Sequence, residues 1–267
     1  MSHTAGAAVA AGAATLAAAG CDTPRLDAEL LVADAMGVDR AALVADPRRE
    51  LDAGVARLAS ERLARRAARE PVAYILGRRG FRRLDLAVDR RVLIPRPETE
   101  LLVELALGLA PSGGRVHDVG TGSGAIALAL KHERPDLIVS ASDASEAALA
   151  VAVLNRKRLR LDVELVVHRG LPPGPYELVV ANLPYVGLDE WPQLAPELRD
   201  FEPREAFVAG PDGLAVIPAL VREAPSGTLL ALEHGATHGA AVRALLRDAQ
   251  THRDLAGHER VTVGRAP

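Results

Sequence analysis

The sequence predicts an α/β fold in which helices cover both faces of a parallel sheet, preceded by a small helical bundle. Three observations in the 267 residues support this prediction. From residue 115 onward, short apolar runs alternate with helical patterns, as in folds built from strand–helix–strand units. Before residue 70, apolar residues recur at helical spacing and no strand pattern is present. A glycine-rich stretch, residues 120–124, lies between a predicted strand and a predicted helix, where such folds bind ligands.

Residues 1–70 are expected to form the helical bundle. Thr23-Pro24 has the pattern of a helix N-cap followed by proline at the first helical position, and Gly37 is typical of a helix end. Glu70-Pro71 ends the bundle, because the residue before a proline avoids the helical conformation. The predicted helices are 5–19, 24–37 and 51–69, and a short segment at 39–45 separates the last two.

Residues 71–96 are predicted to be a connector that contains a β-hairpin. Residues 84–89 alternate apolar and polar side chains, with the period of a half-buried strand, and residues 91–94 are the expected partner strand. Pro95-Arg96-Pro97 then begins a helix, with Glu98 in the first turn, where the helix dipole favours acidic side chains. We assign Arg96 and Glu98 to the capping of this helix rather than to closure over a site.

Residues 97–267 are predicted to form the α/β domain. After the strand at 178–181 comes a segment, residues 184–203, that is too long for a simple turn, and such insertions often act as functional lids. The predicted strands are 115–119, 137–141, 163–167, 178–181, 227–233, 254–255 and 261–263, and the predicted helices after the first are 124–132, 144–158, 214–222 and 237–249.

Composition narrows the class of protein. Hydrophobic residues make up 49% and charged residues 25% of the chain, as in ordinary soluble globular proteins. Cys21 is the only cysteine, which excludes a disulfide within one chain and suits a reducing cytoplasm. We find no membrane-spanning pattern, and the alanine-rich start lacks the basic flank of a signal peptide. We therefore expect a cytoplasmic protein with no membrane partner.

Charge is unevenly distributed along the chain. The net charge is −3, yet residues 57–91 contain eleven arginines and four acidic residues, a local charge of +7. The rest of the chain therefore carries a charge of about −10. A solvated helix face accounts for such a segment, and so does a surface for an acidic or RNA-associated partner. The sequence leaves both explanations open.

The stretch Gly120-Thr121-Gly122-Ser123-Gly124, here called the glycine loop, is the first candidate binding site. Its glycines permit a tight turn and a close approach of a ligand, and the helix start after it offers free N–H groups to an anion. Asp143 ends the next strand, where its carboxylate suits both hydroxyls of a ribose. The pattern also fits a dinucleotide site, so an NAD enzyme is an alternative. Asp118, directly before the loop, favours a cofactor with a cationic amine, such as the methionine end of S-adenosylmethionine.

The stretch Asn182-Leu183-Pro184-Tyr185 follows the apolar run 178–181 and is the second candidate site. An asparagine, a proline and a tyrosine at the end of a core strand form a rigid polar position with an aromatic wall. Open α/β sheets place their chemistry at this edge. A dehydrogenase would not require these residues, so the two sites together favour S-adenosylmethionine over NAD.

Three motifs together resemble the protein-(glutamine-N5) methyltransferases that modify peptide chain release factors. The resemblance extends through residues 70–77 and 253–257. The glycine loop is shared by many methyltransferases, whereas its combination with the Ile-Pro-Arg-Pro-Glu-Thr segment is much more specific. The three motifs are Val92-Leu93-Ile94-Pro95-Arg96-Pro97-Glu98-Thr99-Glu100, Asp118-Val119-Gly120-Thr121-Gly122-Ser123-Gly124 and Asn182-Leu183-Pro184-Tyr185.

The resemblance implies a Rossmann-like class I S-adenosylmethionine-dependent methyltransferase domain, with an N-terminal helical bundle for substrate recognition and a β-hairpin linker. It also implies methyl transfer from S-adenosyl-L-methionine to the side-chain amide N5 of the glutamine in the Gly-Gly-Gln motif of class I peptide chain release factors, without stable nucleic-acid binding. The implied catalytic residues are Asn182, Leu183, Pro184 and Tyr185, and the implied cofactor-binding residues are Asp118, Gly120, Thr121, Gly122, Ser123, Gly124, Asp143 and Asn182.

Asn182 suits this chemistry. An amide nitrogen is a weak nucleophile, because its lone pair is delocalised into the carbonyl. The Asn182 side-chain oxygen and the Leu183 carbonyl are suited to accept its N–H groups and to hold the nitrogen in line with the sulfonium methyl. These hydrogen bonds strengthen as positive charge develops on nitrogen, and the proton can leave after transfer. Pro184 restricts the backbone, and Tyr185 offers a flat wall for a planar amide.

Three stretches depart from the family pattern. Leu183 stands where the usual Asn-Pro-Pro-Tyr motif has its first proline, which predicts a less rigid site. The family's acidic residue after the third strand, near the adenine, has no counterpart in residues 168–172. Glu233-His234-Gly235 replaces the commoner Glu-Ile-Gly.

Two other functions stay open. Nucleic-acid adenine-N6 methyltransferases use the same asparagine motif for a flipped base, although the acidic charge and the scarcity of aromatics oppose this reading. A catalytically weak cofactor-binding paralogue is the other, and Leu183 supports it. His234 and His238 lack an evident third ligand, so no metal site is expected. Trp191, the only tryptophan, is either a lid residue or a hydrophobic plug.

Overall fold

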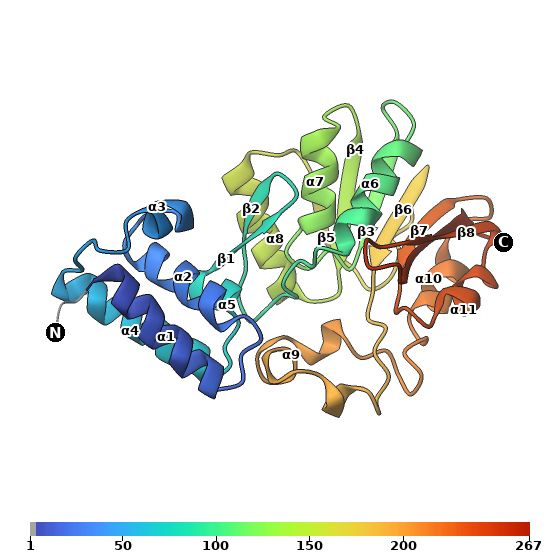
Figure 1. Cartoon of the computed structure of the whole chain (residues 1–267). Coiled ribbons are helices and arrows are strands. Elements are labelled where there is room, and N and C mark those ends of the chain that lie inside the picture. The colour runs from blue at the N-terminus through green and yellow to red at the C-terminus, as the bar shows by residue number, and fades with distance from the viewer. Residues whose placement is uncertain (1–3) are drawn as a thin grey trace. The chain divides into compact units, whose positions relative to one another are not determined.

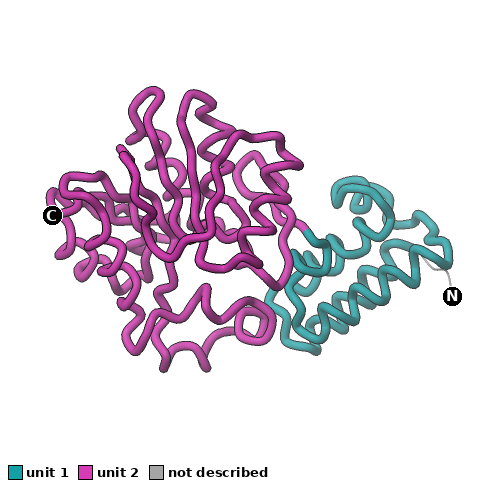
Figure 2. Tube along the Cα trace, turned by 180° about the vertical axis from the view of Figure 1, so that it is seen from behind, with its two compact units in different colours: residues 1–77 teal, residues 78–267 magenta. Residues whose placement is uncertain are grey.

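The computed structural model describes residues 4–267, and the chain divides into two compact units, residues 1–77 and 78–267 (Figure 2). Each unit has its own hydrophobic core. The first three residues of the predicted bundle lie outside the described residues. None of the helices among residues 4–267 has both the length and the apolar character needed to cross a membrane.

The first unit consists of helices (Figure 1). Thr4, Asp39 and Asp52 each accept a hydrogen bond from a backbone N–H in the first turn of a helix, which satisfies a donor that the helix leaves free. The three predicted helices are confirmed, and the short segment at 39–45 is also helical. Residues 71–77 are more than the plain connector we expected, because they contain a fifth, short helix that Gly77 ends with a φ of 69°. The helices are α1 (Ala5–Ala18), α2 (Pro24–Ala35), α3 (Arg40–Ala45), α4 (Ala53–Ala67) and α5 (Val72–Leu76).

The hairpin of the second unit uses a different pair of strands from the predicted one. Strand β2 (Leu84–Ala87) confirms the alternating pattern, but its antiparallel partner is β1 (Arg78–Phe81), which precedes it. The prediction of a strand at 91–94 is wrong. The backbone N–H of Ile94 donates instead to the buried carboxylate of Glu202, at 2.9 Å. A partner so distant in the sequence leaves no local signal.

A seven-stranded sheet organises the second unit, in the order β5-β4-β3-β6-β7-β9-β8 (Figure 1). Its first five strands in this order run parallel, as predicted, whereas β9 pairs antiparallel with β7 and with β8. The carboxyl ends of the parallel strands therefore meet at one edge. The strands are β3 (Arg115–Val119), β4 (Ile138–Asp143), β5 (Glu164–Val167), β6 (Leu178–Asn182), β7 (Leu229–Glu233), β8 (Arg247–Arg253) and β9 (Glu259–Arg265).

Successive residues of the central strand β6 pack on opposite faces of the sheet. Leu178 and Val180 belong to the core cluster that includes α6 and α7, whereas Val179 and Ala181 belong to the cluster that includes α10 and α11. Both faces are covered, which explains why this strand is an uninterrupted apolar run. The helices of the second unit are α6 (Thr99–Leu109), α7 (Ala125–Glu133), α8 (Glu146–Leu159), α9 (Pro196–Phe201), α10 (Ile217–Glu223) and α11 (Gly239–Arg243).

The end of the chain differs from the prediction. The expected helix at 237–249 is only α11, and its last residues already belong to the edge strand β8. The expected strand at 254–255 is instead the turn between β8 and β9, in which the N–H groups of Asp254 and Gly257 make turn hydrogen bonds. An edge strand with polar side chains lacks the apolar pattern that identifies a buried strand. The predicted strand at 261–263 is confirmed within β9.

Candidate active site

A cavity of about 630 Å³ lies at the carboxyl edge of the parallel strands. The turns after β3, β4 and β6 all reach it, because the carboxyl ends of parallel strands share one edge. Six of the residues predicted from the sequence line this cavity. They are Gly120, Gly122, Asp143, Asn182, Leu183 and Pro184. The other predicted residues, Asp118, Thr121, Ser123, Gly124 and Tyr185, do not line it.

The glycine loop turns between β3 and α7 with left-handed backbone conformations. Gly120 and Gly122 have φ values of 75° and 55°, which side chains disfavour. The N–H groups of Gly120 and Thr121 both donate to the Ser142 carbonyl, so the loop is tied to β4. A Cβ at Gly122 would meet nothing within 4 Å. The backbone of Gly122 is therefore open to a ligand in the cavity.

Asp118 lies behind the loop and is not among the cavity-lining residues. Its Oδ2 accepts hydrogen bonds from Thr121 Oγ1 at 2.7 Å and from the Ala127 N–H at 3.2 Å, which joins the loop to α7. Its Oδ1 is buried and has no partner. Burial raises the pKa of this carboxyl to about 7. Asp118 thus stabilises the conformation of the loop, and its Oδ1 remains available to accept a further hydrogen bond.

Asp143, at the end of β4, points its carboxylate at the loop from the cavity side. Its Oδ2 accepts from the Gly122 N–H at 2.9 Å, and its Oδ1 accepts from the Ser145 N–H at 2.8 Å. A carboxylate oxygen has two lone pairs, so each oxygen can accept a second hydrogen bond. Asp143 is therefore a preorganised double acceptor at the cavity wall.

The far end of the cavity holds a carboxylate that sequence reasoning missed. Residues 168–172 contain no acid, but Glu223 of α10 lines the cavity beside them. Its Oε2 accepts from the Leu171 N–H at 2.8 Å. A Cβ at Gly170 would lie only 2.2 Å from the same oxygen, so glycine leaves room for the carboxylate. In the sequence, Gly170 is the only local indication that a side chain packs here. It does not reveal that this side chain is Glu223.

Asn182 ends β6 and lines the same cavity as Asp143. Its Nδ2 donates to Thr99 Oγ1, at the start of α6, at 3.0 Å. Glu233 is its partner in the register of β6 and β7. Burial raises the pKa of the Glu233 carboxyl to about 7, and the nearby Thr99 hydroxyl opposes this shift as a hydrogen-bond donor does. Sequence reasoning missed the role of both partners. In the sequence, the indication was that Thr99 lies at the start of a predicted helix and Glu233 at the end of a predicted strand.

Tyr185 follows the cavity residues but does not line the cavity. Burial, and secondarily the charge of Glu233, raise its pKa to about 12, so the phenol stays neutral. A Cβ at Gly235 would lie 3.5 Å from the Tyr185 ring, so the ring packs close to the turn after β7. The Tyr185 ring thus packs close to that turn, and its role as a flat wall for the substrate amide stays a prediction.

Arg96 and Glu98 do not cap α6 as we expected. Glu98 occupies the N-cap position of α6 without a side-chain capping bond. Arg96 instead forms an ion pair with Glu202, whose side chain is 1% exposed. Glu202 also accepts from the Ile94 N–H, so it ties residues 91–96 to the segment after α9. Both stretches contribute to the cavity wall, through Val92 and Leu93 on one side and Pro203 and Glu205 on the other.

The long segment at 184–203 contains α9 and a 3-10 turn at Trp191–Gln193. Its start is held by a bridge between Val186 and Val208, with the Val186 N–H donating to the Phe207 carbonyl at 2.7 Å. Trp191 packs on the Phe207 ring, with 5.5 Å between centroids. It does not line the cavity, so its packing favours the hydrophobic plug over the lid residue.

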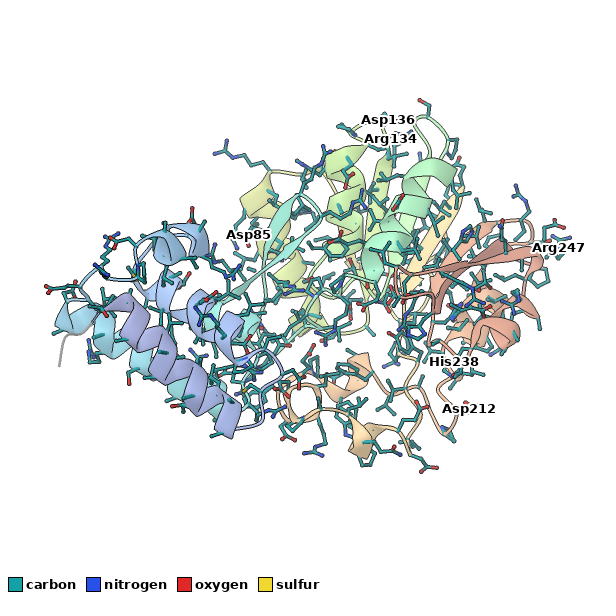
Figure 3. All side chains as sticks on the ribbon, viewed as in Figure 1. Asp85, Arg134, Asp136, Asp212, His238 and Arg247 are labelled. Carbon is teal, nitrogen blue, oxygen red and sulfur yellow. The ribbon has the colours of Figure 1, made fainter. Side chains whose placement is uncertain are left out.

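The two histidines considered for a metal site lie near each other, since burial and then the charge of His238 lower the pKa of His234. His234 is fully buried, and its ring nitrogens contact the Gly235 carbonyl and Thr262 Oγ1 at 2.9 and 2.8 Å. His238 lies at the start of α11 (Figure 3). Among residues 4–267, no group of three or more His, Cys, Asp or Glu side chains is arranged to hold a metal ion.

Comparisons with known proteins agree with this architecture. Residues 7–77 match the PrmC N-terminal domain and residues 97–195 match the methyltransferase small domain. The chain is 47% identical over 264 residues to a release factor glutamine methyltransferase of Pseudomonas aeruginosa, covering 91% of this chain and 94% of that protein. A protein of the same name from Caulobacter vibrioides is 41% identical over 262 residues, covering 92% and 91%.

A solved structure shows the same fold. A methyltransferase from Pyrococcus furiosus aligns with a TM-score of 0.50 at 17% identity, covering 76% of this chain and 96% of that one. The sheet, the glycine loop and the cavity thus define a class I S-adenosylmethionine-dependent methyltransferase fold. The identity to the curated relatives over nearly the whole chain goes further. The chain belongs to the release factor glutamine methyltransferase family.

Proposed function

We propose that this protein transfers a methyl group from S-adenosyl-L-methionine to the side-chain amide N5 of the glutamine in the Gly-Gly-Gln motif of class I peptide chain release factors. The names of its curated relatives support the substrate. A modification of translation factors belongs in the cytoplasm and requires no stable contact with nucleic acid.

The chemistry of the cavity residues fits this cofactor. The spare lone pairs of Asp143 suit the two ribose hydroxyls, and the open backbone of Gly122 allows close approach. At the far end, the carboxylate of Glu223 lies beside apolar groups of Ala148 and Leu220, a combination that suits a flat base with an exocyclic amine. The unpartnered Oδ1 of Asp118 suits a donor at the loop.

The protein contributes positioning to the reaction. When bound, the cofactor supplies an electrophilic methyl group on a sulfonium. Asn182 Oδ1 and the Leu183 carbonyl accept the two N–H groups of the glutamine amide and aim its nitrogen. Both acceptors interact more strongly as positive charge develops on that nitrogen. No base is required before transfer, since the product amide sheds its proton to solvent.

The observation that carries this proposal is that Asn182 shares one cavity with Asp143 and the glycine loop. The test is incubation with labelled S-adenosylmethionine and, separately, a release factor, the same factor with its Gly-Gly-Gln glutamine replaced, and RNA. Label should appear on the unmodified factor alone. Asn182→Ala should abolish the label while calorimetry shows S-adenosylhomocysteine binding within about threefold of wild type. Label on RNA alone would refute the proposal.

A further inference from the structure

The Asn182 carboxamide is held in one orientation by a buried pair behind it. Its Nδ2 donates to Thr99 Oγ1 at 3.0 Å. Glu233 is the partner of Asn182 in the register of β6 and β7, and the nearby Thr99 hydroxyl opposes the rise of its pKa as a hydrogen-bond donor does. Thr99 is 4% exposed and Glu233 is 1% exposed. Neither residue lines the cavity. Thr99 and Glu233 are therefore shielded from water, and the three side chains lead from the sheet interior to the cavity.

The single hydrogen of the threonine hydroxyl gives this chain a direction. An ionised Glu233 can only accept, so it takes the hydroxyl hydrogen of Thr99. Thr99 then has only lone pairs to offer, and these bind the NH₂ end of the Asn182 carboxamide rather than its oxygen. The oxygen of Asn182 is left for the cavity, where an acceptor is needed to hold a substrate N–H.

We propose that Thr99 and Glu233 are positioning residues that determine which end of the Asn182 carboxamide faces the substrate. This inference rests on the proposed function, because it deepens the role of Asn182 in it. The Asn182 side chain could otherwise rotate by half a turn, which would present two donors to an amide nitrogen that also carries hydrogens. Such an arrangement repels the nucleophile instead of holding it.

Protonation of Glu233 would weaken this arrangement. Burial raises its pKa to about 7, although the hydrogen bond from Thr99 opposes the shift. A protonated Glu233 has its own hydrogen to donate to Thr99, which frees the hydroxyl hydrogen for the oxygen of Asn182 and reverses the chain. The titratable and charged groups that surround Glu233 are Arg96, Glu98, Tyr185, His234 and Arg260.

The first test compares two substitutions at one position. Thr99→Val removes the hydroxyl at nearly constant volume, and Thr99→Ser keeps it. We expect T99V to lower kcat for release-factor methylation by about 10²-fold, as misplacement of a reacting group does. KM for the factor should change little, and T99S should remain within about threefold of wild type. Calorimetric affinity for S-adenosylhomocysteine should be the same in all three proteins.

The second test uses pH. In the wild type, kcat should rise between about pH 6 and 8 as Glu233 ionises. Glu233→Gln cannot ionise, and its NH₂ group can donate to Thr99, so this variant should be slow and lose the rise that Glu233 causes. A purely structural role for Glu233 would leave the shape of the pH profile unchanged.

A third readout does not depend on turnover. The side-chain NH₂ signals of Asn182 in an NMR spectrum can be assigned by their loss in Asn182→Ala. They should shift with pH between about 6 and 8 in the wild type and stay fixed in Glu233→Gln. Equal kcat in T99V and wild type would overturn the inference. So would chemical shifts of the wild-type Asn182 signals that do not change with pH. If the wild type methylates no release factor, the proposed function fails, and the NMR result still decides the inference.

Discussion

A Cβ atom at Gly120 would lie 2.9 Å from Cδ2 of Leu183. The residue that departs from the usual Asn-Pro-Pro-Tyr motif is therefore the one that packs on the glycine loop. Leu183 is 7% exposed, so its side chain is part of the wall between the two halves of the site. Its backbone carbonyl is one of the two proposed acceptors for the substrate amide. In this chain, packing against Gly120 takes over part of the restraint that a proline ring would provide.

Substitutions at Leu183 should separate backbone rigidity from packing. Leu183→Pro should raise kcat a few-fold, because proline fixes φ near −65°. Leu183→Ala should lower both kcat and cofactor affinity, since it removes the contact with Gly120 and leaves a gap of the kind that destabilises cores. Steady-state kinetics with a release factor and calorimetry with S-adenosylhomocysteine provide the measurements. An L183P variant slower than wild type would show that the leucine is adapted to its site.

Asp143 should determine the affinity for the ribose. In Asp143→Asn, one oxygen becomes an NH₂ group that faces a backbone donor, either Gly122 or Ser145. We expect affinity for S-adenosylhomocysteine to fall by about 10- to 100-fold, as for loss of a hydrogen bond to a charged group. The matched control is Asp136→Asn, just beyond the C-terminal end of α7, where Asp136 pairs with Arg134 at 2.7 Å (Figure 3). Equal losses in both variants would contradict the assignment.

Glu223 should recognise the exocyclic amine of the base. Wild type should bind S-adenosylhomocysteine about tenfold more tightly than S-inosylhomocysteine, in which oxygen replaces that amine. In Glu223→Ala this preference should disappear, because the acceptor is gone. Glu223→Gln keeps one acceptor for the amine or for the Leu171 N–H and should be intermediate. A preference that persists in E223A would place amine recognition elsewhere.

Asp118 should make the protein less stable at neutral than at acidic pH. Its pKa is raised from 3.8 to about 7 by burial, so between these values the folded state holds a proton that the unfolded state has lost. Stability is then full below about pH 4, falls as the pH rises toward 7, and levels off above it. Asp118→Asn should reduce this slope, so that the stability difference between pH 4 and pH 8 falls by about 4 kcal/mol.

Urea unfolding at several pH values measures this slope. Glu233, whose pKa is also raised to about 7, contributes in the same direction, so one substitution removes only part of it. Asn at position 118 can still accept from Thr121 and Ala127, so the variant should fold. An unchanged slope in D118N would contradict the prediction.

Much of the fold was predictable because its signals are local. The alternation of apolar strands and helical patterns from residue 115 and the glycine loop both depend on neighbouring residues. The predicted cap Thr23 stands at the N-cap position of α2 but makes no side-chain capping bond. The errors have different causes. Residues 91–94 resemble a strand, but the Ile94 N–H donates to Glu202, a partner that is distant in the sequence. Residues 247–253 pair with the next strand, β9, but an edge strand with polar side chains lacks the apolar pattern that identifies a buried strand.

The sequence by itself determined that Asn182, Asp143 and the glycine loop follow strands of a parallel sheet, and hence that they share one edge. That conclusion needs only periodicity, because parallel strands bring their carboxyl ends together. The order of the strands, with β3 between β4 and β6, was decided by the tertiary structure. Only the tertiary structure decided which residues contact and orient these site residues. Thr99 orients the Asn182 carboxamide, Glu233 orients Thr99, and Glu223 fills the space that Gly170 leaves. These contacts join residues 50 or more positions apart, and their hydrogen-bond directions depend on burial, which no local pattern encodes.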